Sequence, residues 1–166
     1  YRFDNRLVLS FALATLAAWF GFTLSFEHRA FWDYHRLYAI AFGLIVLSAG
    51  ILLQRLNIKR HFLDVYLNFT LHFLFIALVS GVFAYGFLSL YFAVLVVLDA
   101  GVVFYALRER KFLYFLYAVL YGYVAVSYLC VDALHSTGLI FSYFIFSSIV
   151  VVWLAVKASR RFREAQ

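Results

Sequence analysis

Residues 60 to 107 decide the fold of this chain. They read RHFLDVYLNFTLHFLFIALVSGVF (60–83), AYGFLSL (84–90) and YFAVLVVLDAGVVFYAL (91–107). Two apolar runs, each long enough to cross a bilayer, flank a short uncharged turn, which predicts an antiparallel transmembrane hairpin. The polar residues inside this hairpin are Asp64, Asn68 and His72 on the first arm and Asp99 on the second.

The composition places the whole chain in lipid. Hydrophobic residues make up 67% of it, aromatic residues 22% and charged residues 13%. Soluble domains average roughly 45–50% apolar and about 25% charged residues. A soluble chain of 166 residues could not bury this much apolar surface. We therefore expect lipid to be its solvent.

Six apolar runs predict an all-α fold, a polytopic transmembrane helical bundle in one domain over residues 1–166. The runs cover residues 7–26, 37–53, 62–83, 87–107, 112–131 and 138–156. Each has about the length that a transmembrane helix needs, and helices satisfy their backbone hydrogen bonds internally, as lipid requires. Because the chain starts at Tyr1 without a methionine, we expect further sequence before it.

The basic residues predict how the helices are oriented. Twelve of the fourteen Lys and Arg residues fall on one side of the predicted bundle, and only Arg29 and Arg36 fall on the other. The twelve are Arg2, Arg6, Arg55, Lys59, Arg60, Arg108, Arg110, Lys111, Lys157, Arg160, Arg161 and Arg163. The side rich in Lys and Arg is normally cytoplasmic, so both ends of this chain are expected in the cytoplasm.

Small residues mark faces for helix packing. Ala39 and Gly43 are four residues apart, and Gly50 lies on the same helix face. Small side chains let helix backbones approach each other closely in membranes. We interpret this face as an ordinary packing surface.

The third predicted helix carries a polar stripe. Asp64, Asn68 and His72 are spaced by four residues and share one helix face. His72 lies roughly 15 Å, and Asp99 roughly 12 Å, from the same membrane surface. The two are therefore predicted to be coupled across the hairpin. The stripe suits either a hydrogen-bonded clamp between helices, which we favour, or a proton or ion relay.

The fifth predicted helix carries a row of tyrosines. The row consists of Tyr114, Tyr117, Tyr121 and Tyr128, continued by Asp132 and His135 if the helix persists. Buried tyrosines need partners for their hydroxyl groups. A row of hydroxyls can conduct protons or water, but it is more often a face that bonds to neighbouring helices, and we favour that interpretation.

No motif in the sequence indicates catalysis, a metal or a cofactor. Six residues fall in predicted outer loops: Glu27, His28, Asp33 and His35 in the first, and Asp132 and His135 in the last. Their spacing matches no metal motif, so we interpret them as solvated. His72 is the only histidine deep in a predicted helix, which leaves no pair of axial ligands for a haem. We expect no catalytic residues, no cofactor and no metal.

Four segments resemble a bacterial family of multi-pass membrane proteins of unknown function. The segments are YRFDNRLVLS (1–10), LAAWFG (16–21), KRHFLDVYL (59–67) and LYGY (120–123). The resemblance implies a helical protein of the bacterial inner membrane. The family has no established catalytic residues, so the resemblance assigns none here.

Two functions fit these patterns best, and a third, an intramembrane enzyme, is the weakest because no nucleophile–base pair is visible in the sequence. The first is a non-enzymatic packing or scaffold subunit, with the bilayer and other membrane subunits or a second copy as partners, and no nucleic acid. The second is a small transporter or proton channel that uses Asp99, His72, Asp64 and the tyrosine row. Many transporters break helices at their binding sites with Gly or Pro. This chain has no proline, which favours the subunit.

Overall fold

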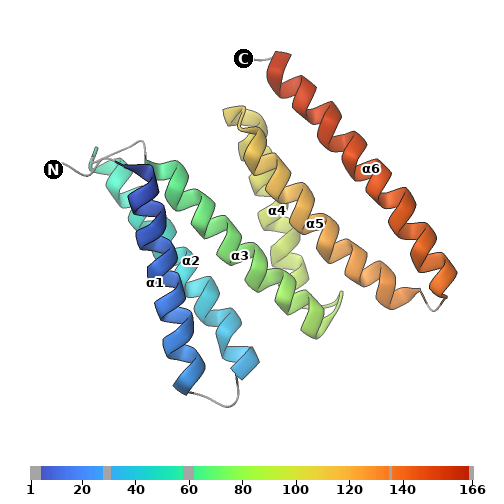
Figure 1. Ribbon diagram of the computed structural model, residues 1–166, viewed down its shortest axis with the longest axis horizontal. Coiled ribbons are helices and arrows are strands. Elements are labelled where there is room, and N and C mark those ends of the chain that lie inside the picture. Colours follow the sequence, from blue (N-terminus) through green and yellow to red (C-terminus); the bar gives the residue numbers. More distant parts are fainter. Residues whose placement is uncertain (1–4, 28–30, 58–61, 135, 165–166) are drawn as a thin grey trace. The chain divides into compact units, whose positions relative to one another are not determined.

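The computed structural model describes residues 5–27, 31–57, 62–134 and 136–164, which contain six α-helices. Side chains are described in these ranges except at 20–27, 31–34 and 163–164. The helices are α1 (Arg6–Glu27), α2 (Phe31–Arg55), α3 (Leu63–Tyr85), α4 (Leu90–Glu109), α5 (Phe112–Ala133) and α6 (Thr137–Glu164) (Figure 1). No strand occurs in the described ranges. The predicted all-α fold with six helices is confirmed.

The helix boundaries differ from the prediction chiefly at two ends. Helix α2 begins at Phe31 instead of residue 37, and α6 continues to Glu164 instead of ending at 156. Both extensions contain charged residues, which hydropathy excludes from a membrane span. Lys, Arg and Glu nevertheless have good helix propensity, so the helices continue past their apolar parts.

Five helices are long and apolar enough to cross a membrane. The qualifying segments are His35–Arg55, Leu63–Tyr85, Leu90–Glu109, Phe112–Ala133 and Thr137–Phe162. The described apolar part of α1, Arg6–Trp19, is shorter than a span. The chain is therefore compatible with a multi-pass membrane protein. The sixth crossing, and with it the location of both ends on one side, stays a prediction.

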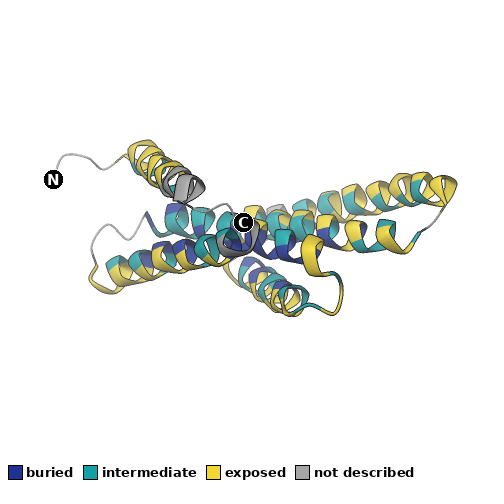
Figure 2. Cartoon of the chain, turned by 90° about the horizontal axis from the view of Figure 1, so that it is seen from below, coloured by how far each residue is buried: buried dark blue, intermediate teal, exposed yellow. Residues whose placement is uncertain are grey.

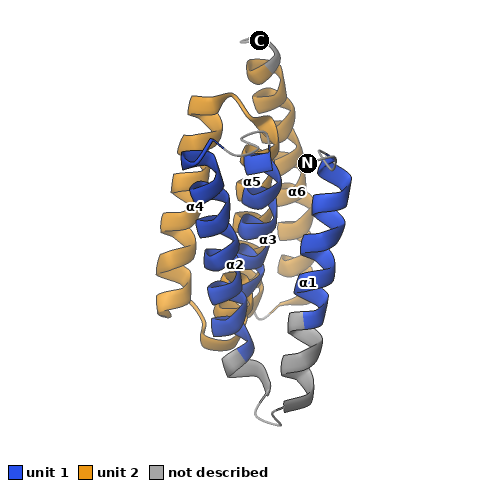
Figure 3. Ribbon diagram, turned by 90° about the vertical axis from the view of Figure 1, so that its left-hand side faces the viewer, with its two compact units in different colours: residues 1–77 blue, residues 78–166 orange. Residues whose placement is uncertain are grey.

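The chain divides into two compact units, with the boundary inside α3 (Figure 3). Unit 1 comprises residues 1–77 and unit 2 comprises residues 78–166. The single domain over residues 1–166 stays a prediction.

Unit 1 joins α1, α2 and the first part of α3 around a small apolar core. The buried members of this core are Leu13, Phe42, Val46 and Val65. Phe42 also packs edge-to-face on Phe73, with their ring centroids 4.9 Å apart. One hydrogen bond fixes the register of two helices, because the buried Thr70 hydroxyl donates to the Gly43 carbonyl at 3.1 Å.

Glycines bring α2 close to α3. A Cβ on Gly50 would lie 2.8 Å from Cβ of Tyr66, and a Cβ on Gly43 would lie 3.3 Å from Cγ of Leu74. Gly43 and Gly50 are two helical turns apart, so they line the same face of α2. The predicted packing role of this face is confirmed.

Unit 2 begins with the hairpin between α3 and α4. Gly86 ends α3 with φ 74°, a conformation that glycine adopts without strain. Ser89 then caps α4, because its hydroxyl oxygen accepts the Phe92 N–H at 3.2 Å. A Cβ on Gly81 would overlap the Tyr91 ring, so glycine permits the close approach of the two helices.

Helices α5 and α6 of unit 2 are joined by two hydroxyl pairs. Tyr123 pairs with Ser147 at 3.1 Å, and Ser127 pairs with Tyr143 at 3.0 Å.

Figure 2 shows buried residues as narrow stripes on helices that are otherwise half-buried or exposed. The most apolar window of α6 contains no buried residue. Exposed apolar surface of this extent suits helices that contact lipid or another subunit.

Candidate functional site

A groove between α4 and α5 contains the most unusual polar group in unit 2. Its volume is about 380 Å³. Its walls are Phe92, Leu95, Val96, Asp99 and Ala100 of α4, and Gly122, Tyr123, Ala125 and Val126 of α5. Only Asp99 and Tyr123 among these carry side-chain oxygens. The groove is thus an apolar surface with one carboxyl group.

The periodicity of α4 turns Asp99 toward α5. Leu95 and Val102, one helical turn before and after Asp99, are both buried, at 2% and 6% exposed. Residues at these spacings share one helix face. Asp99 therefore lies on the face that packs, and not on the exposed face that includes Val97, which is 73% exposed.

Gly122 leaves space for the carboxyl group of Asp99. A Cβ on Gly122 would lie 3.2 Å from Oδ2 of Asp99. The other oxygen, Oδ1, is shielded from solvent and has no hydrogen-bond partner in the described parts of the chain. Burial of a polar group without a partner is costly, and most of all in lipid. In unit 2, Asp99 is therefore the residue that most needs a further hydrogen-bond donor.

The polar stripe of α3 lies in unit 1. Asp64, Asn68 and His72 are all half-buried. Asp64 and His72 each have interactions with other groups, whereas Oδ1 of Asn68 is buried without a hydrogen-bond partner among the described residues. Since His72 belongs to unit 1 and Asp99 to unit 2, their predicted coupling stays a prediction.

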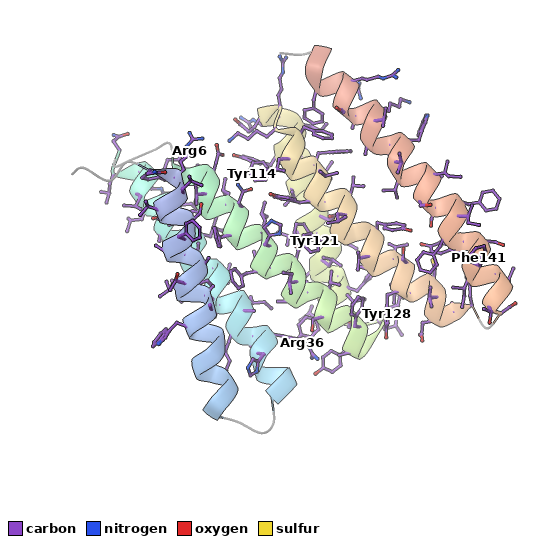
Figure 4. The ribbon with its side chains drawn as sticks, viewed as in Figure 1. Arg6, Arg36, Tyr114, Tyr121, Tyr128 and Phe141 are labelled. Atoms are coloured by element: carbon purple, nitrogen blue, oxygen red, sulfur yellow. The ribbon has the colours of Figure 1, made fainter. Side chains whose placement is uncertain are left out.

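The tyrosine row follows one edge of α5, where Figure 4 labels Tyr114, Tyr121 and Tyr128 in succession. Tyr114 is 2% exposed, and its ring packs against Tyr105 of α4 and Tyr117 of its own helix. Tyr128 donates its hydroxyl to the carbonyl of Phe83 in α3 at 2.9 Å. Tyr117 and Tyr121 are half-buried and have further interactions. Tyr114 and Tyr128 thus contact neighbouring helices, and the choice between a packing face and a relay stays a prediction.

Most residues of the predicted outer loops fall outside the part of the chain whose side chains are described. His28 and His135 fall outside the described residues, as do the side chains of Glu27 and Asp33. Asp132 is exposed in the last turn of α5, and His35 is half-buried in α2. In the part of the chain that the structure describes, no three His, Cys, Asp or Glu residues are grouped as metal ligands would be.

Sequence reasoning missed the hydroxyl pairs of α5 and α6. Tyr123 and Ser127 on α5, and Tyr143 and Ser147 on α6, repeat one Tyr-x-x-x-Ser spacing. In antiparallel helices this spacing lets each tyrosine meet the other helix's serine. A search for matched Tyr-x-x-x-Ser segments in consecutive apolar runs would have found them. Tyr123 is also the phenol that lines the groove beside Asp99.

The chemistry available in the groove is limited. A carboxyl group inside an apolar wall can accept hydrogen bonds from a donor or exchange a proton. The phenol of Tyr123 is already paired with Ser147. The groove is therefore suited to holding one polar group of a ligand among apolar contacts.

Comparison with known proteins adds no relative. No protein-family model matches the chain, and no curated protein or solved structure is detectably similar to it.

Proposed function

We propose that this chain is a non-enzymatic, multi-pass subunit of a membrane assembly that packs through the α4–α5 groove against a transmembrane helix of a partner subunit. The observation that carries this proposal is the carboxyl group of Asp99, whose Oδ1 lacks a hydrogen-bond partner in the described chain. The groove around it is apolar and large enough, at about 380 Å³, to accept side chains of another helix.

The partner helix must supply a hydrogen-bond donor at the depth of Asp99. A carboxylate near the middle of a bilayer costs at least ~2.5 kcal/mol on insertion scales. A donor from a packed helix offsets part of that cost, and the apolar wall provides the van der Waals contacts that drive helix association in lipid. Because a carboxylate can accept several hydrogen bonds, a partner donor at Oδ1 is compatible with the predicted coupling of Asp99 to His72.

Site-specific photo-crosslinking in native membranes tests this proposal. A benzophenone amino acid at Val126, in the groove, should give one discrete cross-linked species. The same probe at Val152 of α6, which is equally apolar and 62% exposed, is the control and should not. The change Asp99→Leu should abolish the Val126 product, whereas Asp132→Leu, which removes an exposed carboxyl outside the groove, should leave it intact.

The identity of the captured helix sharpens the test. It should carry Lys, Arg, His, Tyr or an amide within its apolar span, and replacing that residue by Leu should also abolish the product. Identical products from Val126 and Val152, or a product that survives Asp99→Leu, would contradict the proposal.

The proposed location is the bacterial inner membrane, with both ends of the chain in the cytoplasm. The distribution of Lys and Arg supports this orientation, and the resemblance to the bacterial family supports this membrane. In a Cys130→Ser background, Glu109→Cys should resist a membrane-impermeant maleimide added to intact cells and react after the cells are opened. Labelling of intact cells would exclude this topology.

A proton channel or small transporter is the second candidate. It is favoured by the same carboxyl group, since an acid without a fixed partner can exchange a proton. Reconstituted wild-type protein would then conduct protons across liposomes, and Asp99→Asn would abolish that flux while Asp132→Asn would not. If liposomes that contain the wild-type protein conduct protons no faster than empty liposomes, this candidate is eliminated.

A further inference from the structure

A second cavity lies at the basic end of unit 2. It has a volume of about 330 Å³ and is lined by Leu107, Arg110, Arg161 and Phe162. Two guanidinium-bearing side chains thus share a cavity with two large apolar side chains. The phenyl ring of Phe162 packs against Phe112 and Phe115 of α5, at centroid distances of 5.7 and 5.9 Å. These contacts hold the apolar wall in place.

The cavity lies where three apolar segments end. The candidate span of α4 ends at Glu109, that of α5 starts at Phe112, and that of α6 ends at Phe162. In a bilayer, residues at the ends of spans lie at the level of the lipid headgroups. The two arginines therefore occupy the depth at which lipid phosphates are found.

The electrostatics of this end favour an anion. Among the residues of this end whose side chains are described, the acidic one is Glu109 and the basic ones are Arg108, Arg110, Lys111, Lys157, Arg160 and Arg161. Arg163 and Glu164 follow in α6 and carry opposite charges. The N-terminus of α5 begins here without a side-chain cap, so its first N–H groups and the positive end of its dipole add to the attraction. The Lys111 ammonium lies over the Tyr114 ring, with Nζ 5.7 Å from the ring centroid. The Lys157 ammonium lies over the Trp153 ring, with Nζ 4.7 Å from the ring centroid.

We propose that this cavity binds the phosphate headgroup of an anionic phospholipid. Arg110 and Arg161 contact the phosphate, for which the planar guanidinium is well suited because it can donate two hydrogen bonds at once. Leu107 and Phe162 contact the first part of an acyl chain. A soluble phosphate would use only the arginines, and the apolar half of the cavity is the reason to assign a lipid. Basic pockets between transmembrane helices commonly bind such headgroups. The proposal is independent of the groove at Asp99.

Lipid retention by the purified full chain tests the site. The protein in neutral detergent is titrated with phosphatidylglycerol or cardiolipin, and single bound lipids are counted by native mass spectrometry. The double change Arg110→Gln and Arg161→Gln should weaken binding of the first lipid at least about tenfold. Phosphatidylcholine, which has no net charge, should bind weakly to the wild type.

The matched control is the double change Arg108→Gln and Arg160→Gln. It removes the same charge from the same helix ends, at exposed residues that do not line the cavity. It should alter the affinity by less than about threefold. Thermal unfolding of both variants verifies that each is folded.

Three outcomes would overturn the proposal. Equal losses in both double variants would mean diffuse attraction to a basic surface. Unchanged binding in the cavity variant would place the lipid elsewhere. Displacement of the lipid by inorganic phosphate at millimolar concentration would mean that the cavity recognises a free anion. Arg110→Lys with Arg161→Lys should recover part of the affinity, because the charges remain while the two-pronged contacts do not.

Discussion

The two units use different means to hold helices together. In unit 1, α2 lies against α3 through Gly43 and Gly50, and one buried hydroxyl, that of Thr70, bonds to backbone across the contact. In unit 2, α5 lies against α6 through two pairs of side-chain hydroxyls. Unit 2 also contains a groove whose carboxyl oxygen lacks a hydrogen-bond partner among the described residues.

Both units pack helices within the chain, but they rely mainly on different contacts. Lipid provides no hydrophobic force between helices, so they associate through close van der Waals contact and interhelical hydrogen bonds. In unit 1, Gly43 and Gly50 supply close contact and Thr70 adds one hydrogen bond to backbone. In unit 2, Gly81 permits close contact of α3 with α4, and the hydroxyl pairs join α5 to α6. In unit 2, the buried Oδ1 of Asp99 lacks a hydrogen-bond partner among the described residues, which is why we connect it with a partner subunit.

The largest expected effect concerns whether the polar residues of the two units act together. The sequence predicts that Asp99 and His72 are coupled. If they meet as an ion pair, Asp99→Asn and His72→Gln should each cost ~3–5 kcal/mol of unfolding free energy, because each leaves a buried partner unpaired. Unfolding of the purified chain by SDS measures these losses, and the double variant should lose less than their sum. Additive losses would rule out the coupling.

The next effect tests the close contact in unit 1. Gly50→Ala places a Cβ 2.8 Å from Cβ of Tyr66, so the helices must separate, at a cost of ~1–3 kcal/mol. Gly101→Ala on α4 is the matched control, because a Cβ there meets nothing within 4 Å. It should be neutral or gain up to ~1 kcal/mol from helix propensity. Equal losses for the two variants in SDS unfolding would show that Gly50 acts through α2 itself and not through packing.

The sequence predicted the helices well and their side-chain contacts unevenly. Hydropathy located every helix because apolar length is what a bilayer selects. The four-residue spacing of small residues identified Gly43 as a packing position, because that pattern can be recognised in the sequence of one helix alone. It missed the Tyr123–Ser147 pair, because that signal appears only when the spacings of two helices are compared. The groove at Asp99 could likewise not be predicted. The sequence shows the carboxyl group, but its position beside Gly122 depends on how α4 packs on α5.

A smaller effect concerns the hydroxyl of Thr70 in unit 1. Thr70→Val keeps the shape of the side chain and removes the hydrogen bond to the Gly43 carbonyl. We expect a loss of about 1 kcal/mol. Thr15→Val is the control, because the Thr15 hydroxyl donates to the Phe11 carbonyl of its own helix, at 2.8 Å. If the two variants unfold at the same SDS fraction, the bond between α2 and α3 contributes nothing measurable.

The smallest effect concerns the hydroxyl pairs of unit 2. Tyr143→Phe removes the pair with Ser127 and keeps the ring, so it should cost about 0.6 kcal/mol, the average for such bonds in membranes. Ser148→Ala is the control, because the Ser148 hydroxyl donates to the Ile145 carbonyl of its own helix, at 3.0 Å. In a double-mutant cycle, Ser127→Ala should add little once Tyr143→Phe is present, since both remove the same bond. Full additivity in that cycle would mean that the two hydroxyls stabilise the helices separately, and the contrast between glycine packing in unit 1 and hydroxyl pairing in unit 2 would then lose its basis.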